Sequence, residues 1–394
     1  MRKALLYYLY GTSNAGDMAI CLGAADLLKE KGYAVTMVSR FSASEQEYVR
    51  SKEFIQRYYP DVEVYPGPFS FERGFSTVKK IKSYAVSFLK ICHVLPDKLN
   101  RKLIAEHDVV FFNGGNLLRG ETIADYLRLT ALFYPIELAK KMKKPVFCLP
   151  QSTAGISFTG KQLLKKFFYG LQKIYVREEM SFRELSTQFP AVPFLCSTDL
   201  AFFCSDNSVA IKGFKEKYGK FSYVDVTIIL RSTGIGDIGF LDQTLSDKMV
   251  GMLEEYVHHH PELKYRIIVQ TQKDREFSER FLRRIVCFAC VELVEEHDPL
   301  ILREMYKHTS FTISMRLHAA ILSLSAGTPV VGIFSEVWGL KNPGIMSSYD
   351  MPYMIVEQGG GTLDNLIESI PENVKERIHD IIHSEREAIA FEDE

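Results

Sequence analysis

The chain alternates short apolar runs with longer segments of helical periodicity, and this alternation restricts the folds open to it. The apolar runs of the first half are continuous, as in parallel strands that are buried on both faces. These runs span residues 3–9, 34–38, 108–112, 145–149 and 173–176. Segments with helical spacing separate them, at 17–31, 123–141 and 178–188. Because strands that alternate with helices form parallel sheets, the first half is predicted to be a doubly wound α/β domain.

The same alternation begins again after residue 205, which predicts a second α/β domain. Its strand-like runs span 223–230, 265–271, 312–314 and 329–333, and helical spacing occupies 241–258, 275–286 and 317–325. A length of 394 residues also exceeds what one hydrophobic core usually supports. With the polar stretch 204–209 as linker, we expect Rossmann-like domains at 1–205 and 206–371, a C-terminal helix within 372–394, and an active site in the cleft between the domains.

The composition excludes several classes of protein. A formal net charge of −1 argues against a general polyanion binder, so no nucleic-acid partner is expected. No apolar run is long enough to span a membrane and the first residues lead straight into an apolar strand, which favours a cytoplasmic protein. The seven cysteines are scattered, and an odd number fits reduced, buried thiols, including the C-x-x-C pair Cys287 and Cys290.

One stretch, 73–102, is strongly basic. It carries eight lysines or arginines against a single acid, Asp97, with apolar and aromatic residues interleaved. One interpretation is a surface that attracts the inner face of an anionic membrane or a pyrophosphate-linked substrate. The other is a solvated helix that covers the sheet.

Two loops that follow strands of the first half are rich in small and polar residues. The first, 10–17, contains Asn14 and ends at Asp17, where a helix begins. Ligands of doubly wound sheets lie at such strand ends, and the N–H groups of a helix start favour anions or sugar hydroxyls. Asp17 is interpreted either as a general base or as a helix N-cap.

The second loop follows the strand at 108–112 and contains a glycine pair between Asn113 and Asn116. Together with Arg119 and Glu121, these amides could hydrogen-bond a saccharide. The alternative is an ordinary turn in which the glycine pair relieves backbone strain.

Two arginines directly follow predicted strands. Arg177 comes at the end of the strand at 173–176, where a guanidinium can hold a carboxylate or phosphate with two hydrogen bonds. The alternative is an ion pair with Glu178, Glu179 or Asp199. Arg231 follows the strand at 223–230 in the same way, and the segment 270–274 ends the next strand.

The most informative segment is 311–333, which reads as a strand, a helix and another strand in close succession. The apolar positions Leu317, Ala320 and Leu324 fall on one face of the helix, so Arg316 and His318 lie off the buried stripe at its first turn. The helix dipole disfavours a cation there unless an anion neutralises it. This suggests a bound anion, with His318 suited to donate or accept a proton near neutral pH.

With these motifs the chain resembles the polysaccharide pyruvyl transferase family. The resemblance rests on segments 14–17, 113–117, 177–181, 197–199, 230–231, 315–321 and 327–330. It implies a fold like the GT-B glycosyltransferases, phosphoenolpyruvate as the donor substrate and a cyclic pyruvate ketal as the product. It implies no cofactor, and the sequence shows no carboxylate cluster with the spacing of a metal site.

The resemblance also implies roles for the donor side, which is expected in the C-terminal domain. Arg177 and Arg316 would hold the donor's carboxylate and phosphate, with Arg231 and Lys341 as further contacts, and His318 would act as general acid. The stretch 334–341, which contains Lys341, departs from the Tyr-containing stretch that is usual in the family.

The acceptor side is expected in the N-terminal domain. Asp17 or Glu121 would deprotonate an acceptor hydroxyl, and Asn14, Asn113 and Asn116 would bind the sugar. Asn113 begins a loop in which many members carry another glycine, so acceptor specificity is open. The acceptor is expected to be a precursor of a surface or capsular polysaccharide, with a lipid-pyrophosphate-linked form as one option.

Two other functions fit part of this pattern. A GT-B glycosyltransferase that uses a nucleotide sugar is the first, because the segment 327–331 is also seen at donor sites of that fold. An inactive saccharide-binding or assembly subunit is the second, although a binding module has no need of a proton donor such as His318.

Overall fold

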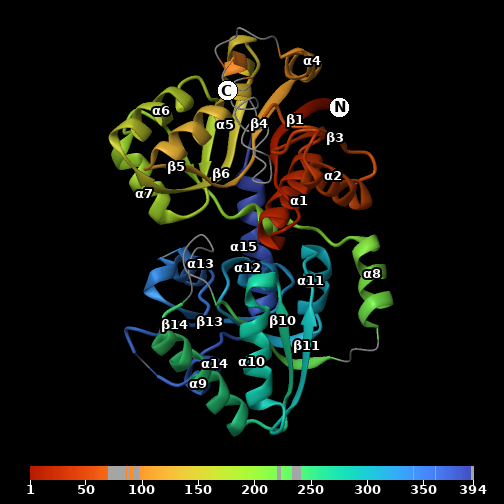
Figure 1. Cartoon of the computed structure of the whole chain (residues 1–394), viewed down its shortest axis with the longest axis vertical. Helices are drawn as coiled ribbons and strands as arrows, with labels where there is room; N and C mark the ends of the chain where they lie inside the picture. Colours follow the sequence, from red (N-terminus) through yellow and green to blue (C-terminus); the bar gives the residue numbers. More distant parts are fainter. Residues whose placement is uncertain are drawn as a thin grey trace. The chain divides into compact units, whose positions relative to one another are not determined.

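The computed structural model describes residues 1–69, 86, 89–91, 97–219, 223–232, 241–339, 341–359 and 361–391. The chain forms two compact units, shown in Figure 1. Unit 1 contains Met1–Thr12, Asp17–Ser205 and Glu385–Glu394, and unit 2 contains Ser13–Gly16 and Asp206–Ser384. Most of the basic stretch 73–102 lies outside the described residues, so its predicted membrane contact stays a prediction.

Unit 1 is built on an eight-stranded sheet with the order β3-β2-β1-β4-β6-β7-β8, in which β5 also pairs with β6. The described pairs are all parallel. The strands are β1 (Arg2–Leu9), β2 (Tyr33–Ser39), β3 (Glu63–Tyr65), β4 (Val109–Phe112), β5 (Gly115–Gly120), β6 (Val146–Ile156), β7 (Lys173–Val176) and β8 (Phe194–Cys196). The central strands are buried along most of their length, which explains their continuous apolar runs.

Helices pack around this sheet (Figure 1). They are α1 (Ala15–Glu30), α2 (Gln46–Tyr58), α4 (Lys98–Glu106), α5 (Ile123–Lys141), α6 (Phe158–Phe168) and α7 (Glu179–Gln188), followed by the 3-10 turn η1 (Leu200–Phe203). The start of α5 is fixed by a capping box, because the side chains of Thr122 and Asp125 each accept a backbone hydrogen bond from the other residue. Ser157 caps α6 in a similar way.

Aromatic side chains fill much of the core of unit 1. The ring of Phe391 lies 4.8 Å from that of Phe111 and 5.4 Å from that of Phe147, measured between centroids. Tyr175 Oη donates to the carbonyl of Ala390 at 2.8 Å. The last described residues therefore belong to the core of unit 1.

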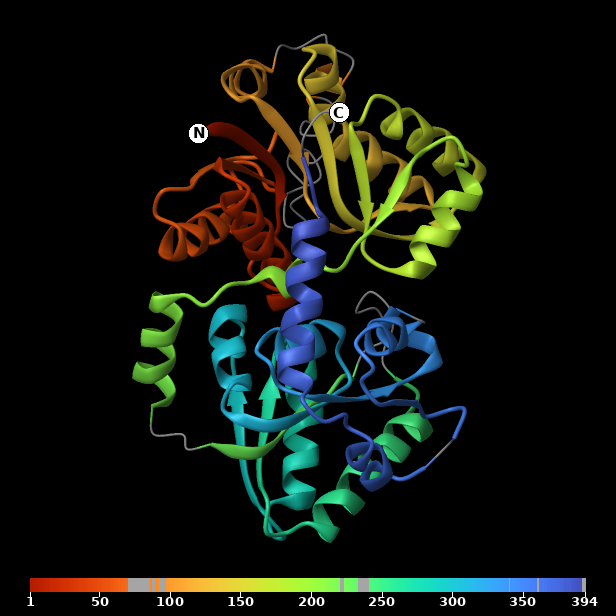
Figure 2. The same ribbon diagram turned by 180° about the vertical axis from the view of Figure 1, so that it is seen from behind.

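Unit 2 contains a six-stranded parallel sheet with the order β11-β10-β9-β12-β13-β14. Its strands are β9 (Val224–Ile229), β10 (Lys264–Val269), β11 (Cys290–Glu295), β12 (Thr309–Ser314), β13 (Val330–Phe334) and β14 (Tyr353–Ile355). Its helices are α8 (Ser208–Tyr218), α9 (Gln243–His259), α10 (Arg275–Ile285), α11 (Pro299–Tyr306), α12 (Leu317–Ser325), α13 (Lys341–Ser348), α14 (Leu363–Glu368) and α15 (Val374–Ala388), of which the last residues, from Glu385, belong to unit 1. Short 3-10 turns, η3 (Gln272–Asp274) and η4 (Glu336–Trp338), follow β10 and β13. Figure 2 shows α15 in blue as one continuous helix.

These two parallel sheets with their helices confirm the predicted fold class of two Rossmann-like domains. Two predicted helices, α5 and α12, have the predicted bounds to the residue. Within the part of the chain described, no helix is both long and apolar enough to cross a membrane.

The prediction of buried cysteines is wrong for part of the set. Cys21, Cys148 and Cys204 are buried, but Cys287 and Cys290 are exposed, as is Cys196. The physical reason is the position of the C-x-x-C pair, which spans the turn after α10 and the start of β11, a strand at the edge of the sheet. No group of three metal-ligating side chains occurs among the described residues.

Candidate functional site

The carboxyl edge of the unit 2 sheet gathers most of the predicted donor-side residues. Strands β10, β9, β12 and β13 are neighbours and parallel, so the residues that follow them meet at one edge. Arg231 follows β9, Asp274 closes the turn after β10, and Arg316 follows β12. This edge is the candidate anion-binding site.

Arg316 is held at this edge by the backbone and by one carboxylate. It occupies the N-cap position of α12, and Ser314 Oγ accepts a hydrogen bond from its backbone N–H at 3.1 Å. Its Nε donates to Oδ2 of Asp274 at 2.5 Å. The Asp274 side chain is 1% exposed and that of Arg316 is 13% exposed, so the two charges form a largely buried ion pair. A cation at the start of α12 was expected to need a neutralising anion, and Asp274 supplies part of that negative charge. The position of Arg316 alone therefore no longer requires a bound anion.

Asp274 also connects Arg316 to the loop after β9. Its Oδ1 accepts a hydrogen bond from the backbone N–H of Ser232 at 3.0 Å and lies 3.0 Å from Ser232 Oγ. One buried carboxylate thus holds three segments that follow three different strands. The segment 270–274 was predicted to end a strand, but no role was predicted for Asp274 itself. Its only sequence signal is an acid placed a few residues after a buried strand.

Arg231 stacks on an aromatic ring at the same edge. Its guanidinium carbon lies 4.9 Å from the centroid of Trp338, a cation–π arrangement that orients the group. Trp338 closes η4, and Lys341 begins α13 a few residues later. Trp338 belongs to the stretch 334–341, which differs from the stretch that is usual in the family. This stretch therefore provides the ring on which Arg231 stacks. The loop at 233–240, which follows Arg231, lies outside the described residues.

His318 lies in the first turn of α12, two residues after Arg316, and is half-buried. Gly16, which belongs to the same unit, approaches it closely. A Cβ atom built on Gly16 would lie 2.3 Å from Nδ1 of His318, which no real side chain tolerates. Glycine at position 16 is therefore needed for the imidazole to occupy this place.

The loop before α1 corrects one interpretation. Helix α1 begins at Ala15, so Asp17 lies inside its first turn and is not the N-cap. Asn14 Oδ1 instead accepts a hydrogen bond from the backbone N–H of Gly16 at 3.0 Å, the bond expected of a capping side chain. The structure therefore gives Asn14 a local structural contact, while Asp17 is half-buried.

Arg177 is placed at the carboxyl end of β7 in unit 1, with its charge already paired. Its Nη1 lies 2.5 Å from Oδ2 of Asp199, and its Nε lies 2.5 Å from Oγ of Ser152. Arg177 is 6% exposed and Asp199 is fully buried. The ion pair with Asp199, which the sequence analysis kept as the alternative, is present in the structure.

Asn113 is also directed inward. Its side chain is fully buried, its Nδ2 donates to the carbonyl of Tyr8 at 2.9 Å, and its Oδ1 accepts from the backbone N–H of Gly114 at 2.8 Å. The next residue, Gly115, has φ +126°, and a Cβ there would lie 2.3 Å from Oη of Tyr10. Asn113 thus shapes the turn, and a direct contact with a sugar would need its amide to be released.

The other polar residues after β4 are exposed. Asn116 and Glu121 both lie at the surface of unit 1. Arg119 forms an ion pair with Asp125 at 2.8 Å. Burial alone would raise the pKa of Asp125, but hydrogen bonds from Arg119 and Thr122 lower it to about 2. The guanidinium of Arg119 is therefore bound to Asp125 at the start of α5, while Asn116 and Glu121 are exposed.

The structure thus brings Arg231, Arg316 and Asp274 together in unit 2, with His318 on the same helix as Arg316 and Lys341 at the start of α13. In unit 1 it joins Arg177 to Asp199 and Ser152, and separately sets Asn113 into the sheet edge.

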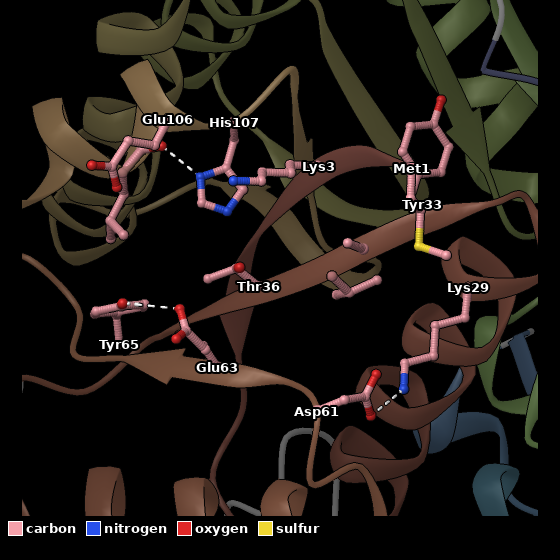
Figure 3. A pocket seen from close by; sticks show the side chains of 13 residues that line it. Met1, Lys3, Lys29, Tyr33, Thr36, Asp61, Glu63, Tyr65, Glu106 and His107 are labelled. Carbon is pink, nitrogen blue, oxygen red and sulfur yellow. Dashed lines mark hydrogen bonds and ion pairs between the residues drawn. The ribbon is translucent and has the colours of Figure 1, made fainter.

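A hollow of about 700 Å³ in unit 1 lies elsewhere, at the amino ends of β1, β2 and β3 (Figure 3). None of the predicted site residues lines it. Its charges are mixed, and Lys29 is paired with Asp61 at 2.7 Å. We therefore do not assign the candidate activity to this hollow.

Comparison with known proteins identifies the relatives of this chain. The family described as polysaccharide pyruvyl transferase matches residues 14–333. A search of curated protein sequences finds no significant match.

Solved structures share the fold at low sequence identity. A UDP-GlcNAc 2-epimerase from Neisseria meningitidis, bound to UDP-GlcNAc, matches with TM-score 0.56 and 14% identity, covering 95% of this chain and 94% of that one. A UDP-GlcNAc 2-epimerase from Methanocaldococcus jannaschii matches with TM-score 0.55 and 10% identity, covering 98% and 100%. A glycosyltransferase from Rickettsia africae ESF-5 matches with TM-score 0.54 and 12% identity, covering 98% and 93%. At these identities the likeness concerns the fold alone.

Proposed function

Because the chain belongs to the polysaccharide pyruvyl transferase family, we propose that it transfers a pyruvyl group from phosphoenolpyruvate to a saccharide of a surface-polysaccharide precursor. The product is a cyclic pyruvate ketal, and phosphate is released. The observation that carries the proposal is the edge of the unit 2 sheet, where Arg316 is fixed by Asp274 and shares the start of α12 with His318. The reaction requires an anion-binding group and a proton donor, and this edge offers both.

The proposed reaction balances without a redox partner or metal. A proton adds to the methylene carbon of phosphoenolpyruvate and makes C2 electrophilic, and one sugar hydroxyl attacks C2 and loses its proton. The C2–O bond to phosphate then breaks, and a second hydroxyl attacks C2 and closes the ring. Two hydroxyl protons are lost, one proton is gained by carbon and one leaves with phosphate.

In this proposal Arg316 binds the carboxylate or phosphate of the donor through charge-assisted hydrogen bonds. Asp274 acts as a positioning residue, since it holds Nε and leaves the guanidinium in one orientation. His318 delivers the proton as general acid. Arg231, oriented by Trp338, and Lys341 are further donor contacts.

The unit 1 residues have a separate part in the proposal. Arg177 is a further donor contact at the end of β7, although its hydrogen bonds to Asp199 and Ser152 direct its guanidinium inward, so it could reach a donor only after these contacts open. Asp17 or Glu121 accepts the hydroxyl proton, and Asn113 and Asn116 shape the acceptor loop or bind the acceptor. Asn14, which belongs to unit 2, is proposed as a further acceptor contact. The proposed reaction uses no cofactor, and phosphoenolpyruvate takes part in it as a substrate.

Phosphoenolpyruvate is expected to raise the melting temperature of the protein, whereas a nucleotide sugar is not. A ligand at one hundred times its Kd stabilises the folded state by about 2.7 kcal/mol. The measurement is a thermal melt with each donor, followed by an assay of phosphate release with a saccharide acceptor. Stabilisation by UDP-glucose alone, with sugar transfer and no phosphate release from phosphoenolpyruvate, would replace the proposal with the glycosyltransferase alternative.

Asp274→Asn is expected to raise KM for phosphoenolpyruvate by about tenfold, a loss of about 1.4 kcal/mol, with a smaller change in kcat. The amide keeps the shape of the side chain but removes the charge that orients Arg316. Asp242→Asn is the matched control, because it makes the same change at the N-cap of α9 in the same unit, where Asn also caps well, and no contact of Asp242 with Arg316 is involved. Equal KM values for wild type and Asp274→Asn would remove the positioning role.

A further inference from the structure

In a second concave region of unit 1, nearly all of the charged side chains that line it are cations. A hollow of about 1230 Å³ lies where β6 and β7 begin, with walls from the last turns of α5 and α6 and the turns that follow them. Seven lysines and a single acid contribute to its lining. The lysines are Lys140, Lys141, Lys143, Lys144, Lys165, Lys166 and Lys173. Since the whole chain has a formal net charge of −1, this lysine hollow is a local concentration of positive charge.

Two of the lysines are used to hold the walls. Lys140 Nζ lies 2.6 Å from Oε1 of Glu137, so the single acid of the lining is already paired. Lys144 Nζ donates to the carbonyl of His107 at 2.7 Å. These contacts fix the two ends of the turn between α5 and β6.

Four other lysines have no such partner. Within the described part of the chain, no carboxylate lies within ion-pair distance of Lys143, Lys165, Lys166 or Lys173. Two helices end at this hollow, and their dipoles together offset about one positive charge. The hollow therefore keeps an excess of positive charge that neither a side chain nor a helix end removes.

The hollow of Figure 3, also in unit 1, does not carry such an excess of positive charge. Lysines line that hollow too, but Asp61, Glu63 and Glu106 line it with them, and Lys29 is paired. Of these two hollows, only the lysine hollow carries a large excess of one sign. Like charges gathered in this way disfavour the folded state unless a counter-ion is bound.

We propose that the lysine hollow binds the phosphate groups of a multiply charged ligand such as a diphosphate. Its cations are all lysines and none is an arginine. Lysine binds phosphate as a compact point charge with three N–H donors, and several lysines together can neutralise a multiply charged group. The hollow lies at the amino end of β7, and Arg177 follows the carboxyl end of the same strand. It is therefore a separate anion site, independent of the proposed function.

The probe for the test is inorganic pyrophosphate, titrated calorimetrically at low ionic strength. The Arg316→Gln background removes the donor-site arginine, so that binding reports on the lysine hollow. In that background, changing Lys143, Lys165, Lys166 and Lys173 together to Gln is expected to weaken pyrophosphate binding by about tenfold or more. The matched control changes Lys52, Lys212, Lys215 and Lys264 to Gln, which alters the net charge equally but leaves the hollow intact, and its affinity should stay unchanged.

A second arm identifies the source of the phosphate. Sedimentation with phosphatidylcholine vesicles that carry phosphatidic acid, lost in the hollow variant and kept in the control, would assign a lipid headgroup. Pyrophosphate binding without sedimentation would assign a soluble phosphate compound. Equal pyrophosphate affinity in the background and in the hollow variant, or no binding in the background, would overturn the proposal. Failure of phosphoenolpyruvate turnover in the wild type would leave this result untouched.

Discussion

Arg316→Gln is expected to reduce kcat/KM for phosphoenolpyruvate-dependent phosphate release by about 1000-fold. The guanidinium is the cation that the structure fixes most firmly at the carboxyl edge of the unit 2 sheet. Two hydrogen bonds to a charged group are worth about 1.5–3 kcal/mol each, and every 1.36 kcal/mol is tenfold in rate. The measurement is steady-state phosphate release at several donor concentrations.

The variant also changes stability, and the design has to separate the two effects. Asp274 is 1% exposed, and removing its partner leaves a buried carboxylate unpaired, which costs about 3–5 kcal/mol. The double variant Arg316→Gln with Asp274→Asn removes both charges, and Asn keeps the shape of the buried aspartate. We expect it to recover most of the melting temperature and none of the activity.

A return of activity in the double variant would show that Arg316 acts only through stability. Wild-type kcat/KM in the single variant would remove Arg316 from the donor site altogether. Either result would leave the family membership intact and would move the donor site elsewhere in the chain.

The fold was predictable because long, strongly patterned elements carry their own signal. Helices α5 and α12 have apolar positions at helical spacing and clear boundaries, such as the capping box at Thr122. The strands β3, β8 and β14 are three residues long, too short to show a pattern, and were not predicted. The six-residue strands β5 and β11 were not predicted either, because neither forms a continuous apolar run. Their place in the sheets depends on tertiary packing.

The candidate site was predictable only in part, because the order of the strands in the sheet differs from their order along the chain. Asp274 follows β10 and Arg316 follows β12, and the two meet because β9 alone separates those strands in the sheet. That adjacency, and hence the ion pair, could not be read from a separation of 42 residues. The predicted roles of the site residues stay predictions.

Side-chain direction was the second thing that the sequence could not supply. Asn113 and Arg177 follow strands, as predicted, yet both side chains turn inward and bond to Tyr8 and Asp199. A position at a strand end indicates where a residue lies but not which way its side chain points. Glu121, which also follows a strand, is exposed, and so is Asn116 within β5.

His318→Ala is expected to lower kcat by about 100- to 10,000-fold while phosphoenolpyruvate still raises the melting temperature. A general acid acts in the transition state, whereas the charge that binds the donor belongs to Arg316 and its neighbours. The imidazole packs closely against Gly16, so its replacement by the smaller alanine opens space there and introduces no steric clash. His379→Ala is the matched control, since the His379 side chain is 77% exposed on α15 and should leave kcat unchanged.

Added imidazole provides the sharper form of this test. If His318 delivers the proton, free imidazole can occupy the space that the variant opens and restore part of kcat, with no comparable gain in Arg316→Gln. A loss of the melting shift in His318→Ala, together with no rescue, would instead assign His318 to donor binding. The proton would then have to come from another group, and the separation of roles between Arg316 and His318 on α12 would no longer hold.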